Sequence, residues 1–468
     1  MSQLASMSLT ETAEAIRTGA ITPVSVVEAY LSRIAELDGQ LHSFATVAAD
    51  RALVQAHNAT REICNGQWRG LLHGIPLGLK DAIYTTEIKT GLGSPVFTDW
   101  HAPHNATVVT RIEQAGGIVI GKLTLTEGVY ADHHPTTEAP VNPWGPAHWT
   151  GTSSSGAGVA VAAGLCLGSL GTDTGGSIRL PSSCCGVVGI KPTWGRVSRY
   201  GVFPLAESLD HVGPMCRTVA DSAAMLGAIA GADSADPTAS LAPVPDYMAT
   251  LDDGIAGRRI GIDWRYIRSR STDEVVASIE AVLSVVTRLG AEIVPVSFPD
   301  PDDILRGWAV ECAVEAAIAH EGLYPEQKHN YGPRLTALLE RGHKFDAMTL
   351  ARAQKSRRDF QGIVSRLFAD VDMLIVPGLP VAGPTMDHMA SLGEDPAAIL
   401  AIGPFTAPFD VSLHPTITVP CGFSDRGIPI GFQFVGPYFS EALLCTAGHA
   451  YQTATDWHHR RPVLPLEL

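Results

Sequence analysis

Apolar residues recur every three or four positions from residue 8 to about residue 60, a spacing that predicts helices. The spacing is clearest in one short set: Leu9, Ala13 and Ile16. Ser8 stands just before this set and Glu11 follows three residues later, which is the pattern of a capping box at a helix N-terminus. We therefore expect an N-terminal helical segment over residues 8–60.

After residue 72, short apolar runs alternate with Gly-rich turns and helical stretches. We interpret four of these runs as strands: 75–79, 117–120, 159–165 and 187–190. Such alternation predicts an α/β fold in which a mixed, mostly buried β-sheet is surrounded by helices.

The second half of the chain continues the alternation. The pattern predicts amphipathic helices over 218–232 and 273–290 and a largely helical region over 300–365. Strands are expected at 291–296, 372–381 and 416–420. We find no internal repeat and no low-complexity linker in residues 1–468, and α/β enzymes of this length often form one large domain.

Composition narrows the range of partners. The 468 residues include 33 basic and 48 acidic side chains, a net charge of −15, which disfavours broad binding to nucleic acid or to an anionic membrane. No apolar run approaches the roughly 20 residues that span a bilayer. The eight cysteines are scattered, and the N-terminus lacks a basic region followed by an apolar core. We expect reduced thiols and a cytoplasmic location.

Two segments rich in glycines and hydroxyl groups stand out, residues 151–158 and residues 171–179. An isolated stretch of this kind is usually a turn. Here both are flanked by apolar sequence, and buried hydroxyls need hydrogen-bond partners. Ser177 follows two glycines, so the backbone amides of Thr174, Gly175, Gly176 and Ser177 are placed to converge on one point. Such a nest of donors stabilises an oxyanion.

A serine hydroxyl is a weak nucleophile until a base takes its proton. Neither segment contains a histidine, although the chain has 17. Upstream, Lys80 closes the apolar run 74–81. Burial there lowers the pKa of a lysine toward that of a usable base. The alternative is a lysine at a strand end that reaches solvent.

These three segments resemble those of the amidase signature family of serine hydrolases. Ser153 and Ser177 lie 24 positions apart, which matches the family's spacing between its bridging and nucleophilic serines. The resemblance covers roughly residues 10–462, and it continues through several shorter stretches: 197–201, 208–210, 213–214, 405–409, 419–422 and 457–458.

The resemblance implies a role for each residue of the site. Lys80 is the general base, Ser153 the bridging serine that follows a cis peptide bond from Thr152, and Ser177 the nucleophile that forms an acyl-enzyme. The remaining implied roles are these: Thr174, Gly175 and Gly176 as backbone oxyanion hole, Asp173 and Arg179 as support, and Tyr130 and His133 as walls of the substrate pocket. The resemblance also implies that residues 1–468 form a single large α/β/α domain, with a catalytic core over residues 70–232 and a variable helical pocket region over residues 300–365.

Five residues depart from the family pattern. Thr152 and Ser155 stand where glycine is usual, and Ala157 stands where serine is common. Asp410 replaces a common asparagine and Leu413 a common glycine, at positions that we expect near the pocket wall. These departures bear on the range of substrates rather than on the class of reaction.

The resemblance implies hydrolysis of a carbon–nitrogen acyl bond in a small-molecule amide, with carbamates and esters left open, by a monomer or homodimer that needs no metal or cofactor. One alternative is the glutamine-hydrolysing component of a tRNA amidotransferase, although residues 126–131 depart from that component's usual stretch. Another alternative is a non-catalytic scaffold that binds an amide.

Two other motifs are weak. Residues 116–122 fit a phosphate-binding loop up to its lysine, but Leu123 stands where the metal-binding hydroxyl belongs. The histidine pairs at 133–134 and 458–459 are adjacent and do not share a helix face, so we expect no metal site there.

Overall fold

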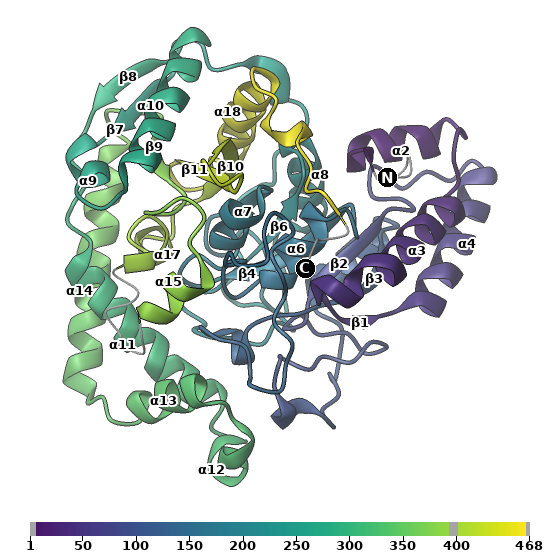
Figure 1. The fold of residues 1–468 in the computed structure, drawn as a ribbon, viewed down its shortest axis with the longest axis horizontal. Helices are drawn as coiled ribbons and strands as arrows, with labels where there is room; N and C mark the ends of the chain where they lie inside the picture. The colour runs from purple at the N-terminus through teal and green to yellow at the C-terminus, as the bar shows by residue number, and fades with distance from the viewer. Residues whose placement is uncertain (1–5, 393–400, 465–468) are drawn as a thin grey trace.

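The computed structural model describes residues 6–392 and 401–464, and within them one mixed sheet of eleven strands runs through the molecule (Figure 1). The strand order is β1-β3-β2-β4-β6-β5-β10-β11-β9-β7-β8. The strands are β1 Phe44–Val47, β2 Pro76–Lys80, β3 Ile118–Leu123, β4 Gly168–Asp173, β5 Val188–Lys191, β6 His211–Cys216, β7 Arg259–Ile262, β8 Glu292–Pro295, β9 Met373–Pro377, β10 Thr416–Phe423 and β11 Pro429–Val435. The predicted α/β class is confirmed.

Helices surround this sheet. They are α2 Leu9–Arg17, α3 Pro23–Leu41, α4 Ala49–Cys64, α5 Thr107–Gln114, α6 Ser155–Ala162, α7 Arg179–Cys185, α8 Val219–Ile229, α9 Trp264–Arg268, α10 Asp273–Arg288, α11 Asp302–Ala319, α12 Tyr324–Gln327, α13 Pro333–Gly342, α14 Ala347–Leu367, α15 Met386–Ser391, α17 Ala407–Val411 and α18 Glu441–Thr453. Figure 1 shows α2, α3 and α4 together near the β1 edge, and α11, α13 and α14 on the opposite side.

The predicted capping box at the start of α2 is present. Ser8 Oγ accepts the Glu11 N–H at 3.1 Å, and Glu11 Oε2 accepts the Ser8 N–H at 2.7 Å. Two of the helix's free N–H groups are satisfied in this way, so the helix begins where the sequence indicates.

Two of the secondary-structure predictions were wrong. The segment 8–60 is not wholly helical, because β1 pairs with β3 at the sheet edge; a strand of only four residues is too short for its alternation to be detected. The run 159–165 lies largely in α6, not in a strand. Every residue of α6 is buried, so its apolar residues show no helical stripe. The sequence analysis also missed the strands β4, β6, β7 and β11; the sequence of β4 contains little besides small residues.

Parallel pairing brings the carboxyl ends of β2 and β4 together. The strands β3 and β4 both pair with β2 in parallel. The carboxyl ends of parallel strands meet at one edge of a sheet, so Lys80 at the end of β2 lies beside Thr172 and Asp173 at the end of β4. This edge carries the glycine- and hydroxyl-rich segments.

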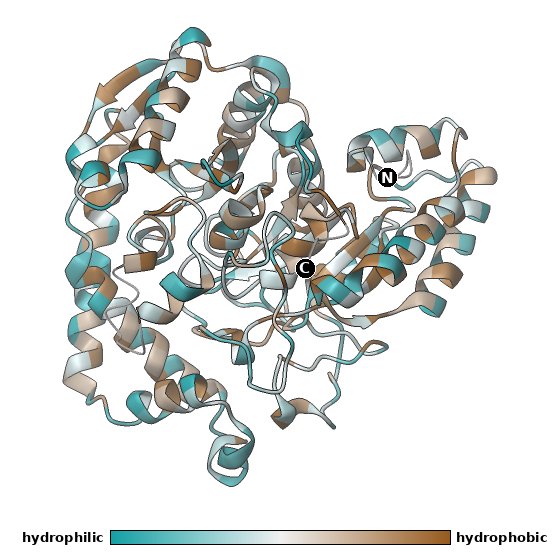
Figure 2. Ribbon diagram, in the orientation of Figure 1, coloured by the Kyte–Doolittle hydropathy of each residue, from teal (hydrophilic) through white to brown (hydrophobic). Residues whose placement is uncertain are grey.

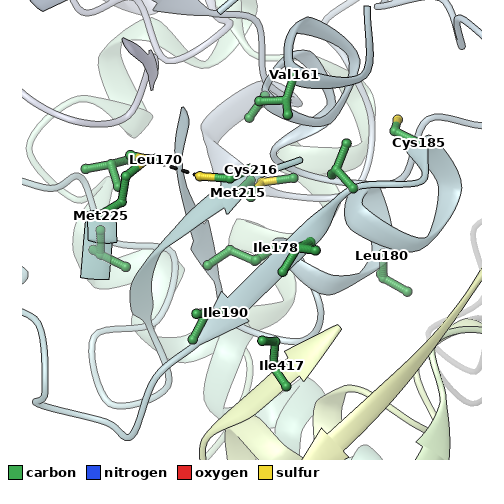
Figure 3. Close-up of a cluster of buried hydrophobic side chains, with 14 of the residues drawn as sticks. Val161, Leu170, Ile178, Leu180, Cys185, Ile190, Met215, Cys216, Met225 and Ile417 are labelled. Carbon is green, nitrogen blue, oxygen red and sulfur yellow. Dashed lines mark hydrogen bonds between the residues drawn. The ribbon is translucent and has the colours of Figure 1, made fainter. Parts of the chain in front are cut away.

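The core is continuous with that edge. Figure 2 shows hydrophobic residues concentrated on the central strands and on α6 and α7, whereas the outer helices alternate in character. Figure 3 shows Ile178 in a cluster with Ile190 and Met215, and all three are buried. Among the described residues, no helix is both long enough and apolar enough to cross a membrane.

Candidate active site

Lys80 is fully buried at the end of β2, and its amine contacts two hydroxyl groups. Nζ donates to Ser153 Oγ at 2.5 Å and to Thr172 Oγ1 at 2.8 Å. Burial lowers the pKa of Lys80 to about 7, against the attraction of Asp173 and Asp210, which raises it. The amine is therefore available in its neutral, proton-accepting form near neutral pH.

Ser153 is also fully buried, and it occupies the turn that precedes α6. The peptide bond from Thr152 to Ser153 is cis, as the resemblance implies. The Thr126 N–H donates to the Ser153 carbonyl at 3.3 Å, and Ser154 Oγ donates to the Thr172 carbonyl at 3.2 Å. These bonds fix the serine segment against β4 and beside Lys80.

Ser177 lies between β4 and α7 and is 8% exposed. Its carbonyl accepts the Ser154 N–H at 3.3 Å, which places the two predicted serines on adjoining segments. Within the described residues, the Ser177 hydroxyl has no hydrogen-bond partner, so this group is unengaged and slightly open to solvent. The structure thus gathers Lys80, Ser153 and Ser177 at one edge of the sheet.

Ile178 anchors the loop that carries Ser177. A Cβ added at Gly189 would lie 2.8 Å from the Ile178 side chain, one at Gly213 would lie 3.1 Å from it, and one at Gly171 would lie 3.2 Å from it. The three glycines belong to β5, β6 and β4. Three strands therefore leave room for one side chain, and its close packing fixes the loop on the sheet.

Asp173 and Arg179 stabilise the same loop through hydrogen bonds and an ion pair. Asp173 Oδ2 accepts the Ile178 N–H at 2.9 Å and the Arg179 Nε–H at 2.9 Å, while Oδ1 accepts Arg179 Nη2 at 2.8 Å. Both side chains are fully buried. Burial alone would raise the pKa of Asp173, but the Arg179 guanidinium holds it well below its usual range.

The backbone donors differ from the expectation at one position. The Gly176 N–H donates to Asp173 Oδ1 at 2.6 Å, so it is not free to bind an oxyanion. The N–H groups of Thr174, Gly175 and Ser177 are buried and have no partner in the described part of the chain. Buried N–H groups without partners are rare, so these three are the donors available to a ligand.

Asp410 was expected near the pocket wall, and the structure places it among buried charged side chains. It is fully buried and forms an ion pair with Arg179, and its Oδ1 lies 3.5 Å from His211 Nδ1. The buried Lys191 amine is 3.2 Å from His211 Nε2. Burial raises the pKa of Asp410 well above its usual range, although the charges of Arg179 and Lys191 act in the opposite direction.

Leu413 follows α17 and is half-buried. Its φ of 65° is in the left-handed region, which glycine adopts without steric cost and which explains why glycine is common there.

Sequence reasoning also missed Thr172 and Trp308, which contact the site. Thr172 lies inside the segment 171–179 that was singled out, but no local signal marks Trp308 in the middle of α11.

A cavity of about 370 Å³ opens beside Thr152, the residue joined to Ser153. His133 is among the residues that line it, and Tyr130 is not. Most of the wall is apolar and includes Trp149, Met386 and Ile402.

The polar groups of this cavity are paired or neutral. His133 Nε2 lies 3.0 Å from Ser155 Oγ, and burial lowers the pKa of His133 to about 4, which keeps the imidazole neutral at neutral pH. Arg334 forms a 3.0 Å ion pair with Asp132 at the rim. Thr152 Oγ1 donates to the Ala131 carbonyl at 2.9 Å. Of the two hydroxyl residues that replace common glycines, Thr152 lines this cavity and Ser155 contacts its wall through His133.

The described residues contain no group of three or more His, Cys, Asp or Glu side chains that is arranged to hold a metal ion.

Solved structures with this fold define the class of the protein. The chain is similar to the native peptide amidase from Stenotrophomonas maltophilia, with a TM-score of 0.83 and 31% identity over 97% of this chain and 98% of that one. It is also similar to a 6-aminohexanoate cyclic dimer hydrolase, with a TM-score of 0.90 and 25% identity over 98% and 99% of the two chains. The class is that of hydrolases acting on carbon–nitrogen bonds.

The sequence comparisons specify the family. The Amidase family matches residues 25–445. A putative amidase, AmiD, of Mycobacterium tuberculosis is 45% identical over 461 residues, which cover 98% of this chain and 96% of the relative. A Glutamyl-tRNA(Gln) amidotransferase component of Roseiflexus is 37% identical over 495 residues and is covered fully, as is this chain. The chain belongs to the Amidase family.

Proposed function

We propose that this protein hydrolyses a carbon–nitrogen acyl bond through an acyl-enzyme on Ser177, with Ser153 and Lys80 as a proton relay. The observation that carries the proposal is the 2.5 Å contact between Lys80 Nζ and Ser153 Oγ in a fully buried setting. A lysine whose pKa is lowered to about 7 is matched to general-base work near neutral pH.

The proposed reaction has two halves. In the first, Ser177 Oγ attacks the substrate carbonyl carbon and its proton passes to Ser153 Oγ, while the Ser153 proton passes to Lys80 Nζ. The new oxyanion accepts hydrogen bonds from the free loop amides. The relay then returns a proton to the leaving nitrogen, and the carbon–nitrogen bond breaks. In the second half, water replaces the amine, attacks the acyl carbon through the same relay and frees Ser177.

Covalent labelling tests the nucleophile. A fluorophosphonate should form one adduct on the peptide that contains residues 175–179, because its phosphonyl oxygen occupies the place of the oxyanion. Peptide mapping by mass spectrometry locates the adduct. Ser183 supplies a matched control, because it is a buried serine of α7 and Ser183→Ala should still be labelled whereas Ser177→Ala should not. Labelling on any other residue would reject the assignment.

The cavity beside Thr152 favours an uncharged substrate. Its apolar wall suits an aliphatic or aromatic group, and its neutral His133 offers hydrogen bonding without charge. Among the described residues, Arg334 is the one cationic side chain on this wall, and Asp132 already pairs with it. We infer that the substrate is an amide with an apolar, uncharged group next to the scissile bond.

Hydrolysis of glutamine is the second candidate, because the amidotransferase relatives are similar over the full chain. Free glutamine carries an α-carboxylate and an α-ammonium group, and among the described residues of the cavity wall only the Asp132–Arg334 pair is charged. We expect kcat/KM for apolar amides to exceed that for glutamine by a wide margin. A glutaminase activity equal to or above the amidase activity would favour the amidotransferase assignment instead.

A further inference from the structure

Trp308 of α11 contacts the loop that carries Ser177. Its Nε1–H donates to the Thr174 carbonyl at 2.8 Å, and the side chain is buried. The indole also packs closely on the next residue, because a Cβ added at Gly175 would lie 2.8 Å from Cζ2 of the ring. One side chain therefore fixes both the carbonyl of Thr174 and the space around Gly175.

Peptide geometry converts this contact into a direction for an N–H group. The Thr174 carbonyl and the Gly175 N–H belong to one planar trans peptide, in which the C=O and N–H bonds point to opposite sides. By holding the carbonyl toward α11, Trp308 turns the Gly175 N–H away from α11. This N–H is buried and has no partner among the described residues.

The next peptide in the loop follows the same rule. Thr406 Oγ1 donates to the Gly175 carbonyl at 2.7 Å, and the Gly176 N–H of that peptide donates to Asp173 Oδ1 at 2.6 Å. Both ends of this second peptide are satisfied within the protein. In the first peptide only the carbonyl end is satisfied, so its N–H is left for a ligand.

We infer that Trp308 is a positioning residue for the oxyanion, acting through the Thr174–Gly175 peptide. The inference rests on the proposed function, in which Ser177 is the nucleophile. Trp308 does not touch the reacting atoms. It holds one donor in the orientation that the developing negative charge requires, and a donor fixed in advance needs no reorganisation during the reaction.

The matched pair of variants is Trp308→Phe and Trp144→Phe. Trp144 Nε1 also donates to a backbone carbonyl at 2.8 Å, that of Cys185, so both variants lose the same type of bond and keep an aromatic ring. The two ligands are a trifluoromethyl ketone and a methyl ketone with the same acyl group. The trifluoromethyl ketone gains a tetrahedral oxyanion on reaction with a serine, whereas the methyl ketone stays largely planar.

For Trp308→Phe we expect kcat to fall by about tenfold or more, since loss of a whole oxyanion donor costs about 10²- to 10³-fold. The affinity for the trifluoromethyl ketone should fall by a similar factor, with KM and the affinity for the methyl ketone unchanged. Trp144→Phe should leave all four quantities unchanged. Should Trp308→Phe fold poorly, benzothienylalanine at position 308 keeps the bicyclic shape and removes only the N–H donor.

Two outcomes overturn the inference, and they differ from failure of the proposed function. Unchanged affinities for both ketones in both variants at position 308 would show that Trp308 only packs against the loop. Equal weakening of both ketones would show a general loss of the pocket. If the wild-type protein itself bound both ketones equally and formed no covalent adduct, the acyl-enzyme on Ser177 would be rejected.

Discussion

Lys80 is a buried amine that makes its hydrogen bonds to two hydroxyl groups, Ser153 and Thr172. The nearest stabilising carboxylates act at longer range, so burial dominates and lowers the pKa to about 7. A lysine that formed a direct ion pair would remain protonated and would not accept a proton. At the scale of single residues, the lowered pKa of Lys80 depends on hydrogen-bond partners that carry no charge.

The first prediction concerns pH. Because the neutral amine is the base, activity should be low below the pKa of Lys80 and should rise as the pH increases through about 7. The measurement is kcat/KM against pH for the wild type and for Lys80→Ala. The variant should lose most of its activity and also this acidic limb. A residual activity that keeps the same limb would assign the titration to another group.

The loop before α7 shows how strands position a nucleophile. Ile178 fits against glycines of β4, β5 and β6, so Ser177 is held by three strands rather than by its own turn. The closest fit is at Gly213, where an added Cβ would lie 2.0 Å from the Ile190 carbonyl oxygen and 3.1 Å from Ile178 Cδ1. At the scale of elements, the position of the Ser177 loop therefore depends on the pairing of β5 with β6.

The second prediction follows from this packing. Gly213→Ala should destabilise the protein by about 1–3 kcal/mol or more, because the new methyl group has no space to enter. The matched control is Gly422→Ala in β10, where an added Cβ would meet no atom within 4 Å. Urea unfolding of both variants measures the difference. Equal midpoints would mean that the three strands adjust freely and do not fix the loop.

The whole molecule contributes to a site that one segment cannot build alone. Arg179 donates to the carbonyl of Thr406, 227 positions later, and pairs with Asp410. Trp308 reaches the same loop from α11. The Ser177 loop is therefore contacted by the segment that contains α17 and by α11. Each of these contacts joins residues that are far apart in sequence.

This explains which parts of the site the sequence could predict. Lys80, Ser153 and Ser177 lie in short segments of unusual composition, and the resemblance of these segments to the amidase signature family assigned each residue a role. Trp308 has no such signal, because its role depends on where α11 packs. Asp410 was recognised as unusual, but only the folded chain shows that it pairs with Arg179. Likewise α6 was misread because a helix buried on all sides has no polar stripe.

The most direct test of the account is the amide-to-ester ratio of relay variants. An amide expels an amine that must gain a proton, whereas an ester expels an alkoxide that needs less help. Positioned acid–base help is worth about 10²- to 10⁴-fold. The measurement is kcat/KM for an amide and an ester that share one acyl group, in the wild type, Lys80→Ala and Ser153→Ala. We predict that both variants lose activity on both substrates, that the amide-to-ester ratio collapses in Lys80→Ala, and that it falls in the same direction in Ser153→Ala. Equal losses on the amide and the ester would contradict the proton relay and would leave Lys80 as a group that only positions the serines.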